Sequence, residues 1–436
     1  MKVYEDNNYF FRHSLNSIVT QYLSSAISVL ISITNARVLG PEGKGKFSLI
    51  VLIPWFAVVL GRLGIGHAVI YCVKKTSKTN LIINSFIIVC FLSIFLVVIT
   101  LPLVFRVKNL FFENIEVKFL IIASFLIPLL LLENYVMAIF QALYRIVLRN
   151  MISIILLLSN LLLLLILTAV LRLGLTGAII SFIVSVILSL LISILFLLKE
   201  MNFKEAKVNL TLIKDLLEYG LKTHIGNVLK DMSYRGDILI ISYFLNPISV
   251  GYYMVAVNIA EMLWKIPEGV GSVLLPCAVK MEKTQVKLFT PLVCRGVIFL
   301  VFIFCLMVFF FRNSIIKFFF GEAYLPSANA LLLLLPGVFA FAIWKILAND
   351  LIAQGLPFYY SFTSFISLVT MIIADFLLIP KLGIKGASLA SSIAYIIATA
   401  LIIVFYLRAT NNNLSKILLP LRTDFEKLLE TLKQNF

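Results

Sequence analysis

Charge is scarce in this sequence. Only 13% of its 436 residues are Asp, Glu, Lys or Arg, whereas 61% are hydrophobic. A soluble globular domain is about one quarter charged and about half apolar, so this composition excludes one. Apolar runs of roughly 18 to 25 residues recur along the chain, and each is long enough to cross a hydrocarbon core about 30 Å thick. The sequence therefore predicts an all-α polytopic membrane protein with about twelve transmembrane helices.

Residues suited to metal or cofactor chemistry are also scarce. The three His and five Cys show no paired spacing, which argues against a metal site and favours free thiols. The glycines Gly61, Gly64 and Gly66 follow no predicted strand, so they do not form a nucleotide-binding loop. We expect no metal site and no cofactor, and coupling to a proton or a sodium ion is left open.

The positive charge of the chain is spread rather than clustered. The net charge is +16, but Lys and Arg are scattered through many loops instead of forming one patch with interleaved aromatic residues. We therefore expect no nucleic-acid partner. Lys and Arg are more frequent in the loops on the side of the N-terminus, and cytoplasmic loops are the ones rich in these residues. This asymmetry predicts that both termini lie in the cytoplasm.

Residues 221–244 form a stretch that is long enough to span but unusually charged. Its middle holds Lys230, Asp231, Arg235 and Asp237. A charge at a helix centre costs about 3 kcal/mol, while each large apolar residue returns only about 0.3 to 0.6 kcal/mol. The stretch therefore cannot face lipid on all sides. On a 3.6-residue period one stripe, predicted to line a transport pathway, contains Thr223, Asn227, Lys230, Tyr234 and Asp237.

A second polar face is predicted on residues 248–275. Asn258, Glu261, Lys265 and Glu268 recur there at helical spacing. Oppositely charged residues three or four apart on one helix can pair with each other. Structural pairing is therefore the alternative to substrate contact for both charged helices.

An internal repeat organises the chain. One part of the repeat has an offset of 206 and aligns Leu39, Pro41, Gly45 and Phe47 with Leu245, Pro247, Gly251 and Tyr253. Farther along the chain, the turn at 173–178 resembles the turn at 382–387. The repeat predicts two six-helix lobes, 1–205 and 206–410, followed by an amphipathic cytoplasmic tail at 411–436. Because each half has an even number of spans, the lobes share one orientation and are related by a parallel pseudo-twofold axis.

The first helices of the two lobes have matching polar faces. At the same offset, Ser17, Gln21, Ser24 and Ser28 correspond to Thr223, Asn227, Lys230 and Tyr234. Polar faces in a membrane are satisfied when they line a shared cavity. We therefore expect a central cleft between two lobes that works by alternating access.

Three motifs in order point to one family. They are ARVLGPEGKGKF at 36–47, the Leu-Gly-x-x-Gly-Ala turns at 173–178 and 382–387, and Asn-Pro-x-x-x-Gly-Tyr-Tyr at 246–253 after the charged helix. Together they resemble the polysaccharide transporter (O-antigen flippase) family of the multidrug/oligosaccharidyl-lipid/polysaccharide (MOP) exporter superfamily. The resemblance covers about residues 12–408.

The resemblance implies a V-shaped pair of six-helix bundles with a central cleft. Such a protein flips undecaprenyl-diphosphate-linked oligosaccharide from the cytoplasmic to the outer leaflet of the bacterial inner membrane, for O-antigen of lipopolysaccharide, capsule or another polysaccharide. It is a transporter and not an enzyme. Its implied partners are this lipid-linked substrate, membrane lipids and other polysaccharide assembly proteins.

In related flippases a cationic cavity binds the anionic substrate. The candidates for the cavity here are Lys230, Arg235, Lys265, Arg62, Tyr234, Asn227, Gln21 and Lys345. The candidates for gating or ion coupling are Asp231, Asp237, Glu261 and Glu268. Bases and carboxylates within the expected spans balance, so the sequence alone does not establish a strongly cationic cavity. Lys345 lies nearer a helix end, where snorkelling to water is the alternative.

Two other functions remain as alternatives. A multidrug cation antiporter of the same fold relies on membrane carboxylates, and residues 15–35 contain none. A membrane glycan polymerase, glycosyltransferase or acyltransferase needs a loop or pocket that assembles catalytic carboxylates or histidines. No long external loop is predicted, and the twofold repeat fits a transporter better.

Overall fold

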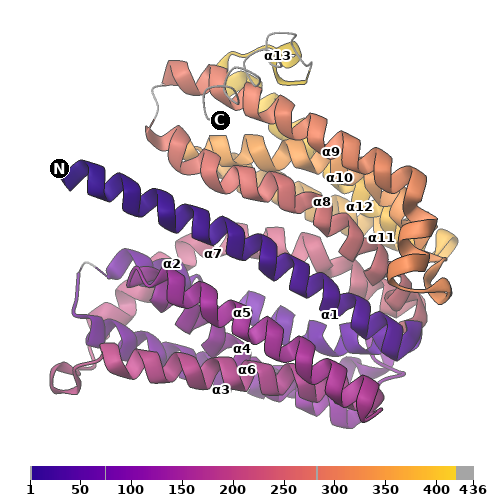
Figure 1. Cartoon of the computed structure of the whole chain (residues 1–436), viewed down its shortest axis with the longest axis horizontal. Coiled ribbons are helices and arrows are strands. Elements are labelled where there is room, and N and C mark those ends of the chain that lie inside the picture. The colour runs from indigo at the N-terminus through magenta and orange to yellow at the C-terminus, as the bar shows by residue number, and fades with distance from the viewer. Residues whose placement is uncertain (1, 74, 281–282, 419–436) are drawn as a thin grey trace. The chain divides into compact units, whose positions relative to one another are not determined.

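Helices make up nearly the whole described chain (Figure 1). The computed structural model describes residues 2–73, 75–280 and 283–418, and these ranges contain no strand. The first half holds α1 (Lys2–Gly61), α2 (Ile65–Cys72), α3 (Lys78–Phe111), α4 (Val117–Ala142), α5 (Ile146–Leu164) with a π-helical extension (Leu165–Val170), and α6 (Gly174–Glu200). The second half holds α7 (Leu210–Phe244), α8 (Pro247–Lys280), α9 (Lys283–Phe319), α10 (Ser327–Ala353), α11 (Pro357–Leu382), α12 (Ile384–Thr410) and α13 (Leu414–Leu418).

The apolar helices are those of a multi-pass membrane protein. Within the described residues, nine helices are long and apolar enough to span: α1, α3, α4, extended α5, α6 and α9 to α12. Helix α1 consists of two helical parts that meet at a kink, where Gly40 has φ 65° and a backbone that is not helical. The two predicted polar faces lie on α7 and α8, which are not among the nine. The predicted all-α polytopic fold is confirmed.

By packing, the chain divides into two compact units, Met1–Val255 and Ala256–Phe436. The N-terminal unit extends past residue 205 because α7 packs against α1, α2 and α3. These units are defined by packing, whereas the lobes 1–205 and 206–410 are defined by the sequence repeat. The two lobes and the cleft between them therefore stay predictions. The predicted amphipathic residues Leu421, Phe425, Leu428 and Leu432 lie outside the described residues.

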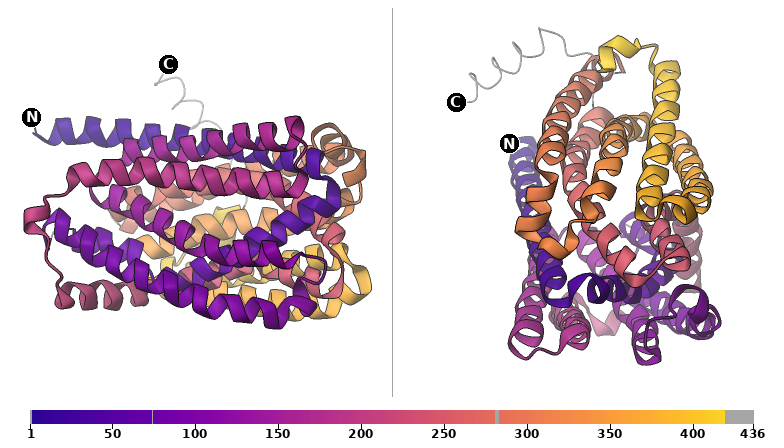
Figure 2. Two further views of the ribbon diagram at one scale, coloured as in Figure 1. Left: turned by 90° about the horizontal axis from the view of Figure 1, so that it is seen from below. Right: turned by 90° about the vertical axis from the view of Figure 1, so that its right-hand side faces the viewer.

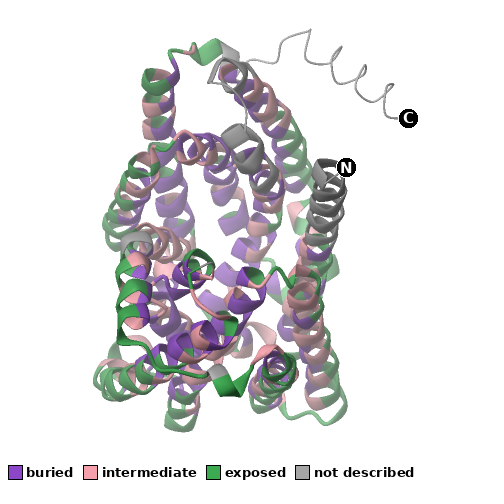
Figure 3. Ribbon diagram, turned by 90° about the vertical axis from the view of Figure 1, so that its left-hand side faces the viewer, coloured by how far each residue is buried: buried purple, intermediate pink, exposed green. Residues whose placement is uncertain are grey.

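The N-terminal unit is a bundle in which α3 packs on α4, α5 on α6, and α1 on α4 and α5. Figure 2 shows these long helices running alongside one another. Figure 3 shows that each helix has buried and exposed residues along its length. Many of the exposed residues are large and apolar, as expected for helices in contact with lipid. One buried polar group of this unit, the Tyr135 hydroxyl of α4, donates a hydrogen bond to the Ile82 carbonyl oxygen of α3 at 2.5 Å.

The C-terminal unit is built around α10, which packs against α9, α11 and α12. Aromatic rings fill the space beside it. Phe341 stacks on Trp344 with 4.7 Å between ring centroids, and Trp264 of α8 lies 5.4 Å from Phe341 and 5.3 Å from Tyr395 of α12. This aromatic core fixes the position of α10, which carries Lys345 and Asp350.

The repeated Leu-Gly-x-x-Gly-Ala turns have the same structural role in both halves. Their first glycines, Gly174 and Gly383, have φ values of 53° and 60°, a region that favours glycine. Their second glycines lie against the preceding helix: a Cβ on Gly177 would lie 3.0 Å from the Leu167 carbonyl oxygen, and one on Gly386 would lie 2.4 Å from that of Leu378. The repeat thus preserves two tight helical hairpins.

Two repeat-related glycines also let α1 and the start of α8 touch backbone to backbone. A Cβ on Gly45 would lie 1.7 Å from the Pro247 carbonyl oxygen, and one on Gly251 would lie 2.1 Å from that of Pro41. These four residues are two of the pairs that the sequence repeat aligns. The offset of 206 therefore reflects a reciprocal helix crossing.

Substitution of either glycine by alanine tests this crossing. Gly45→Ala and Gly251→Ala force the two backbones apart, and overpacking of this kind costs about 1 to 3 kcal/mol or more. We expect each variant to unfold at a lower temperature than the parent in detergent. Gly296→Ala on α9 is the matched control because no heavy atom lies within 4 Å of its added Cβ. A Gly45→Ala protein as stable as the Gly296→Ala protein would contradict the crossing.

Candidate functional site: a cationic cavity in the N-terminal unit

A short non-helical turn between α1 and α2 places Arg62 beside α7. Helix α1 ends at Gly61, and Leu63 and Gly64 have φ values of 42° and 66°, so the chain turns sharply before α2 begins. Helix α7 packs directly on this turn, since a Cβ on Gly220 would lie 2.4 Å from the Leu63 carbonyl oxygen. The glycines here therefore permit both the bend at Gly64 and the close packing of α7 at Gly220. The turn leaves Arg62 facing the charged part of α7.

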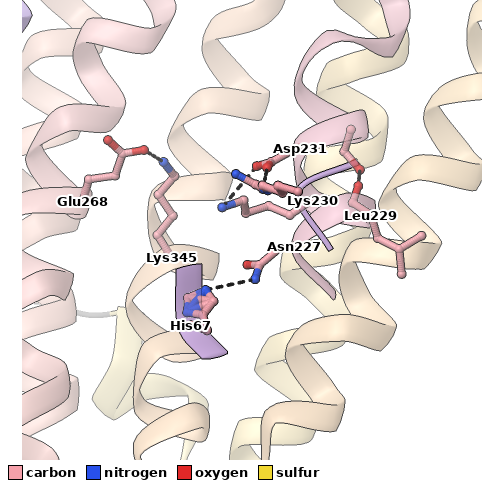
Figure 4. Close-up of polar contacts among 9 residues, drawn as sticks. His67, Asn227, Leu229, Lys230, Asp231, Glu268 and Lys345 are labelled. Carbon is pink, nitrogen blue, oxygen red and sulfur yellow. Dashed lines mark hydrogen bonds and ion pairs between the residues drawn. The ribbon is translucent and has the colours of Figure 1, made fainter. Parts of the chain in front are cut away.

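Asp231 is the centre of an ion cluster. It pairs with the guanidinium of Arg62, and the Nζ atom of Lys230 lies 3.2 Å from its Oδ1 atom (Figure 4). The Asp231 side chain is only 15% exposed, whereas those of Arg62 and Lys230 are 34% and 30% exposed. One carboxylate is thus shared by two bases that remain accessible. The pairing joins two helices far apart in sequence, rather than Asp231 with Arg235 as spacing on one helix allows.

These residues line a cavity of about 490 Å³ within the N-terminal unit. Its walls come from residues 62–70, from α4 and from α7, with Val89 of α3 and Arg149 of α5 completing them. The charged lining consists of the bases Arg62, Arg149 and Lys230 and the single carboxylate Asp231. The cavity therefore attracts anions even while Asp231 is paired.

A second cavity of about 590 Å³ lies in the same unit. It is lined by Thr20, Gln21 and Ser24 of α1, by Glu133 of α4, and by Arg149, Asn150 and Ser153 of α5, together with apolar residues. Arg149 lines both cavities. Gln21 therefore lines a different cavity of this unit from Asn227 and Lys230.

The sequence pattern of the polysaccharide biosynthesis protein family matches residues 35–329, more than half of the chain. The chain belongs to this family. No curated protein matches it in sequence.

Solved structures show which fold this polysaccharide biosynthesis protein has. A structure described as "Lipid II flippase MurJ, inward closed conformation" matches with a TM-score of 0.74 at 17% identity, over 92% of this chain and 88% of that one. An inward-facing multidrug resistance MATE transporter of the MOP superfamily matches with a TM-score of 0.76 at 13% identity, over 91% and 98%. A MOP superfamily transporter from Pyrococcus furiosus matches with a TM-score of 0.65 at 14% identity, over 92% of this chain and 95% of that one. The fold is that of MOP transporters.

The first cavity contains several polar residues that sequence reasoning missed. His67 and His224 line it, and the Nδ2 atom of Asn227 lies 3.5 Å from His67 Nε2 (Figure 4). Asn134 and Gln141 line it from α4. Their spacing of seven places them on one helix face, which is a signal that the sequence offered. The sequence gave no such signal for Arg149, because a basic residue at the start of an apolar helix is typical of a loop facing water.

The other predicted residues of α7 lie outside the two cavities. Arg235 contacts the sulfur of Met254 at 4.0 Å, and Tyr234 is half-buried. Asp237 is 2% exposed and accepts a hydrogen bond from the Tyr253 hydroxyl of α8. The helical stripe thus divides, with Asn227 and Lys230 at the cavity and Asp237 in the protein core. The side chain of Thr223 is outside the described residues.

The predicted polar face of α8 forms a separate ion cluster in the C-terminal unit. The Glu268 carboxylate accepts one hydrogen bond from Lys345 Nζ at 2.5 Å and another from Lys265 Nζ at 3.0 Å. The Lys345 side chain is 6% exposed, and its Nζ atom lies 5.1 Å from the ring centre of Trp264. Lys345 is therefore buried in a pair rather than extended to water. Glu261 is half-buried on the same helix.

The Tyr253 hydroxyl gives a stability test. Tyr253→Phe removes a donor from a buried carboxylate, and an unsatisfied buried acceptor costs about 1 to 3 kcal/mol, more when it is charged. We expect a clear fall in the thermal unfolding midpoint. Tyr22→Phe is the control, because Tyr22 is 49% exposed. Equal midpoints for the two variants would show that the Tyr253–Asp237 hydrogen bond does not stabilise the α7–α8 pair.

Proposed function

We propose that this protein flips an undecaprenyl-diphosphate-linked oligosaccharide from the cytoplasmic to the outer leaflet of a bacterial inner membrane by alternating access. The observation that carries the proposal is the excess of bases in the first cavity, within a member of a polysaccharide biosynthesis family. Such a flippase would serve O-antigen, capsule or another polysaccharide. Membrane lipids and other polysaccharide assembly proteins would be its neighbours.

The ion cluster is suited to exchange one anion for another. Asp231 holds Arg62 and Lys230 in place while the cavity is empty, which avoids unpaired charges inside the membrane. An incoming diphosphate carries more negative charge than one carboxylate and presents several acceptor oxygens. Arg62 can bind two of these at once, and Lys230 can bind as a point charge. Arg149 also lines the first cavity, but it interacts with Glu133 of the second cavity, so the base that Asp231 leaves in excess is one of the pair Arg62 and Lys230.

The remaining lining suits the sugar part of the substrate. The amides of Asn134, Gln141 and Asn227 offer both donors and acceptors, as sugar hydroxyls do. A volume of about 490 Å³ lies within the range of about 300 to 1,000 Å³ that small-molecule sites have. The cavity has room for the diphosphate and the first sugar, while the isoprenoid chain stays in lipid.

The predicted topology agrees with loading from the cytoplasm. If both termini are cytoplasmic, the connection between α2 and α3 and the start of α5 are cytoplasmic as well. Arg62 and Arg149 lie close to these two segments in sequence. The bases would then meet the diphosphate on the side where the lipid-linked glycan is made.

Multidrug cation export is the second candidate, because a MATE transporter shares the fold. The two candidates require opposite electrostatics. Three bases against one carboxylate repel a cationic drug from the first cavity. The second cavity holds one carboxylate, Glu133, and one base, Arg149, so it gives a cation no net attraction.

Charge removal at the cavity tests the proposed function. Lys230→Gln and Arg62→Gln should each weaken binding of undecaprenyl diphosphate to the purified protein by about 10-fold or more, because a hydrogen bond to a charged group contributes about 1.5 to 3 kcal/mol. Equilibrium binding in detergent measures the effect, and thermal unfolding confirms that each variant is folded.

Lys118→Gln is the control for loss of one positive charge. Lys118 pairs with Glu116 at 2.6 Å, is 59% exposed and lies outside both cavities. It should bind as the parent does. Parent-like affinity in folded Lys230→Gln and Arg62→Gln proteins would overturn the site. Binding of hydrophobic cations, with none of the diphosphate lipid, would favour the export of drugs.

A further inference from the structure

The second cavity contains two charged side chains that have no direct partner among the described residues. Glu133 comes from α4 and Arg149 from the start of α5, and both are half-buried. Neither side chain forms a hydrogen bond or an ion pair with another described residue, although the two charges are near enough to interact. Asp231 and Glu268 differ, because each is bound by two bases. The carboxylate oxygens of Glu133 are therefore available to a ligand.

The rest of the lining combines polar and apolar groups. Amides and hydroxyls line the cavity from α1 and from the start of α5, and they belong to Gln21, Ser24, Asn150 and Ser153. Phe182 and Val186 line it from α6 with apolar surface. A sugar ring has hydroxyl groups around its rim, which both donate and accept hydrogen bonds, and C–H groups on its faces. A lining that combines these two kinds of group suits such a ring.

The second cavity is a neighbour of the first. Arg149 lines both, and the consecutive residues Glu133 and Asn134 of α4 line one each. The volume of the second cavity, about 590 Å³, lies in the range of about 300 to 1,000 Å³ that small-molecule sites have. A lipid-linked glycan whose diphosphate and first sugar lie in the first cavity therefore has its next sugar beside the second cavity.

The charges of the second cavity favour a neutral sugar. Its one carboxylate and its one base balance each other, so a neutral sugar leaves the cavity electrically neutral. A uronic acid would bring a second carboxylate to Glu133, and an amino sugar would bring a second cation to Arg149. Either charge would remain uncompensated in partly buried surroundings, which is unfavourable.

We propose that the second cavity binds the second sugar of the lipid-linked glycan and selects an uncharged one. Glu133 accepts hydrogen bonds from the hydroxyl groups of this sugar, Arg149 donates to its oxygen atoms, and Phe182 packs against its C–H face. The proposal rests on the proposed function, because it requires the diphosphate to lie in the first cavity. It adds the class of the second sugar, which the bases of the first cavity do not define.

Equilibrium binding of three lipids to the purified full-length protein in detergent tests the proposal. They are undecaprenyl diphosphate carrying one neutral hexose, the same lipid carrying a neutral disaccharide, and the same lipid carrying a disaccharide whose second sugar is a hexuronic acid. The neutral disaccharide lipid should bind about 10-fold more tightly than the one-sugar lipid, because its hydroxyls gain a charged acceptor in Glu133. The acidic disaccharide lipid should bind no more tightly than the one-sugar lipid.

Glu133→Gln should reverse this preference. The variant keeps the shape of the side chain but leaves Arg149 without a balancing carboxylate, so the neutral second sugar should lose most of its advantage and the acidic one should gain about 10-fold. Each affinity is divided by that of the one-sugar lipid for the same variant, which cancels any effect on the diphosphate.

Glu116→Gln is the matched control for loss of one negative charge. Glu116 lies in the same unit, is 66% exposed, pairs with Lys118 and lines neither cavity. This variant should keep the preference of the parent.

Equal or tighter binding of the acidic disaccharide lipid by the parent would overturn the proposal, and so would an unchanged preference in Glu133→Gln. If the second sugar adds no affinity while Lys230→Gln still weakens binding of the one-sugar lipid, the proposed function stands and the second-sugar site is wrong. If the parent binds none of the three lipids, both are wrong. If Glu133→Gln does not fold, the three affinities of the parent decide.

Discussion

The cost of charge inside a membrane is the constraint on which the site depends. Helix α7 carries Lys230 and Asp231 and packs on the apolar helices α1 and α3, and a charge among apolar helices needs a partner from the protein. Asp231 forms an ion pair with Arg62. Arg62 lies in the turn between α1 and α2, where Leu63 and Gly64 have positive φ values. Gly220 lets α7 approach that turn. Backbone geometry and charge pairing therefore produce the cavity together.

The two units satisfy this constraint in the same manner. In each, one carboxylate is shared by two bases: Asp231 by Arg62 and Lys230, and Glu268 by Lys265 and Lys345. The solvent exposure of these bases differs. Arg62 and Lys230 are about one third exposed at a cavity, whereas Lys345 is buried against aromatic rings. The first cluster is therefore available to a ligand, and the Lys345–Glu268 pair is part of the core.

Much of the fold was predictable from local sequence. Apolar runs gave the long helices, because a span needs an uninterrupted apolar surface. The aligned glycines marked real contacts: Gly45 and Gly251 lie at a helix crossing, and Gly174 and Gly383 have positive φ. The kink within α1 lies at Gly40, whose φ of 65° is one that glycine adopts readily.

The site was predictable only in part, because ion pairs between helices depend on tertiary packing. Asn227 and Lys230 line the first cavity, but Asp237 on the same stripe is buried against Tyr253. Arg149 belongs to the cavity although its sequence position resembles a loop. Counting charges over all expected spans gave balance, whereas the cavity itself has an excess of bases. Charge sign at a site is a property of packing and not of composition.

The sidedness of undecaprenyl-diphosphate-linked glycan tests the central claim most directly. Membranes from cells that lack this protein would be probed with a sugar-modifying reagent that cannot cross the bilayer. The account predicts that the glycan accumulates on the cytoplasmic side, and that the intact gene, but not Lys230→Gln, restores its exposure on the outer side. Normal exposure of the glycan in cells without the protein would contradict flipping.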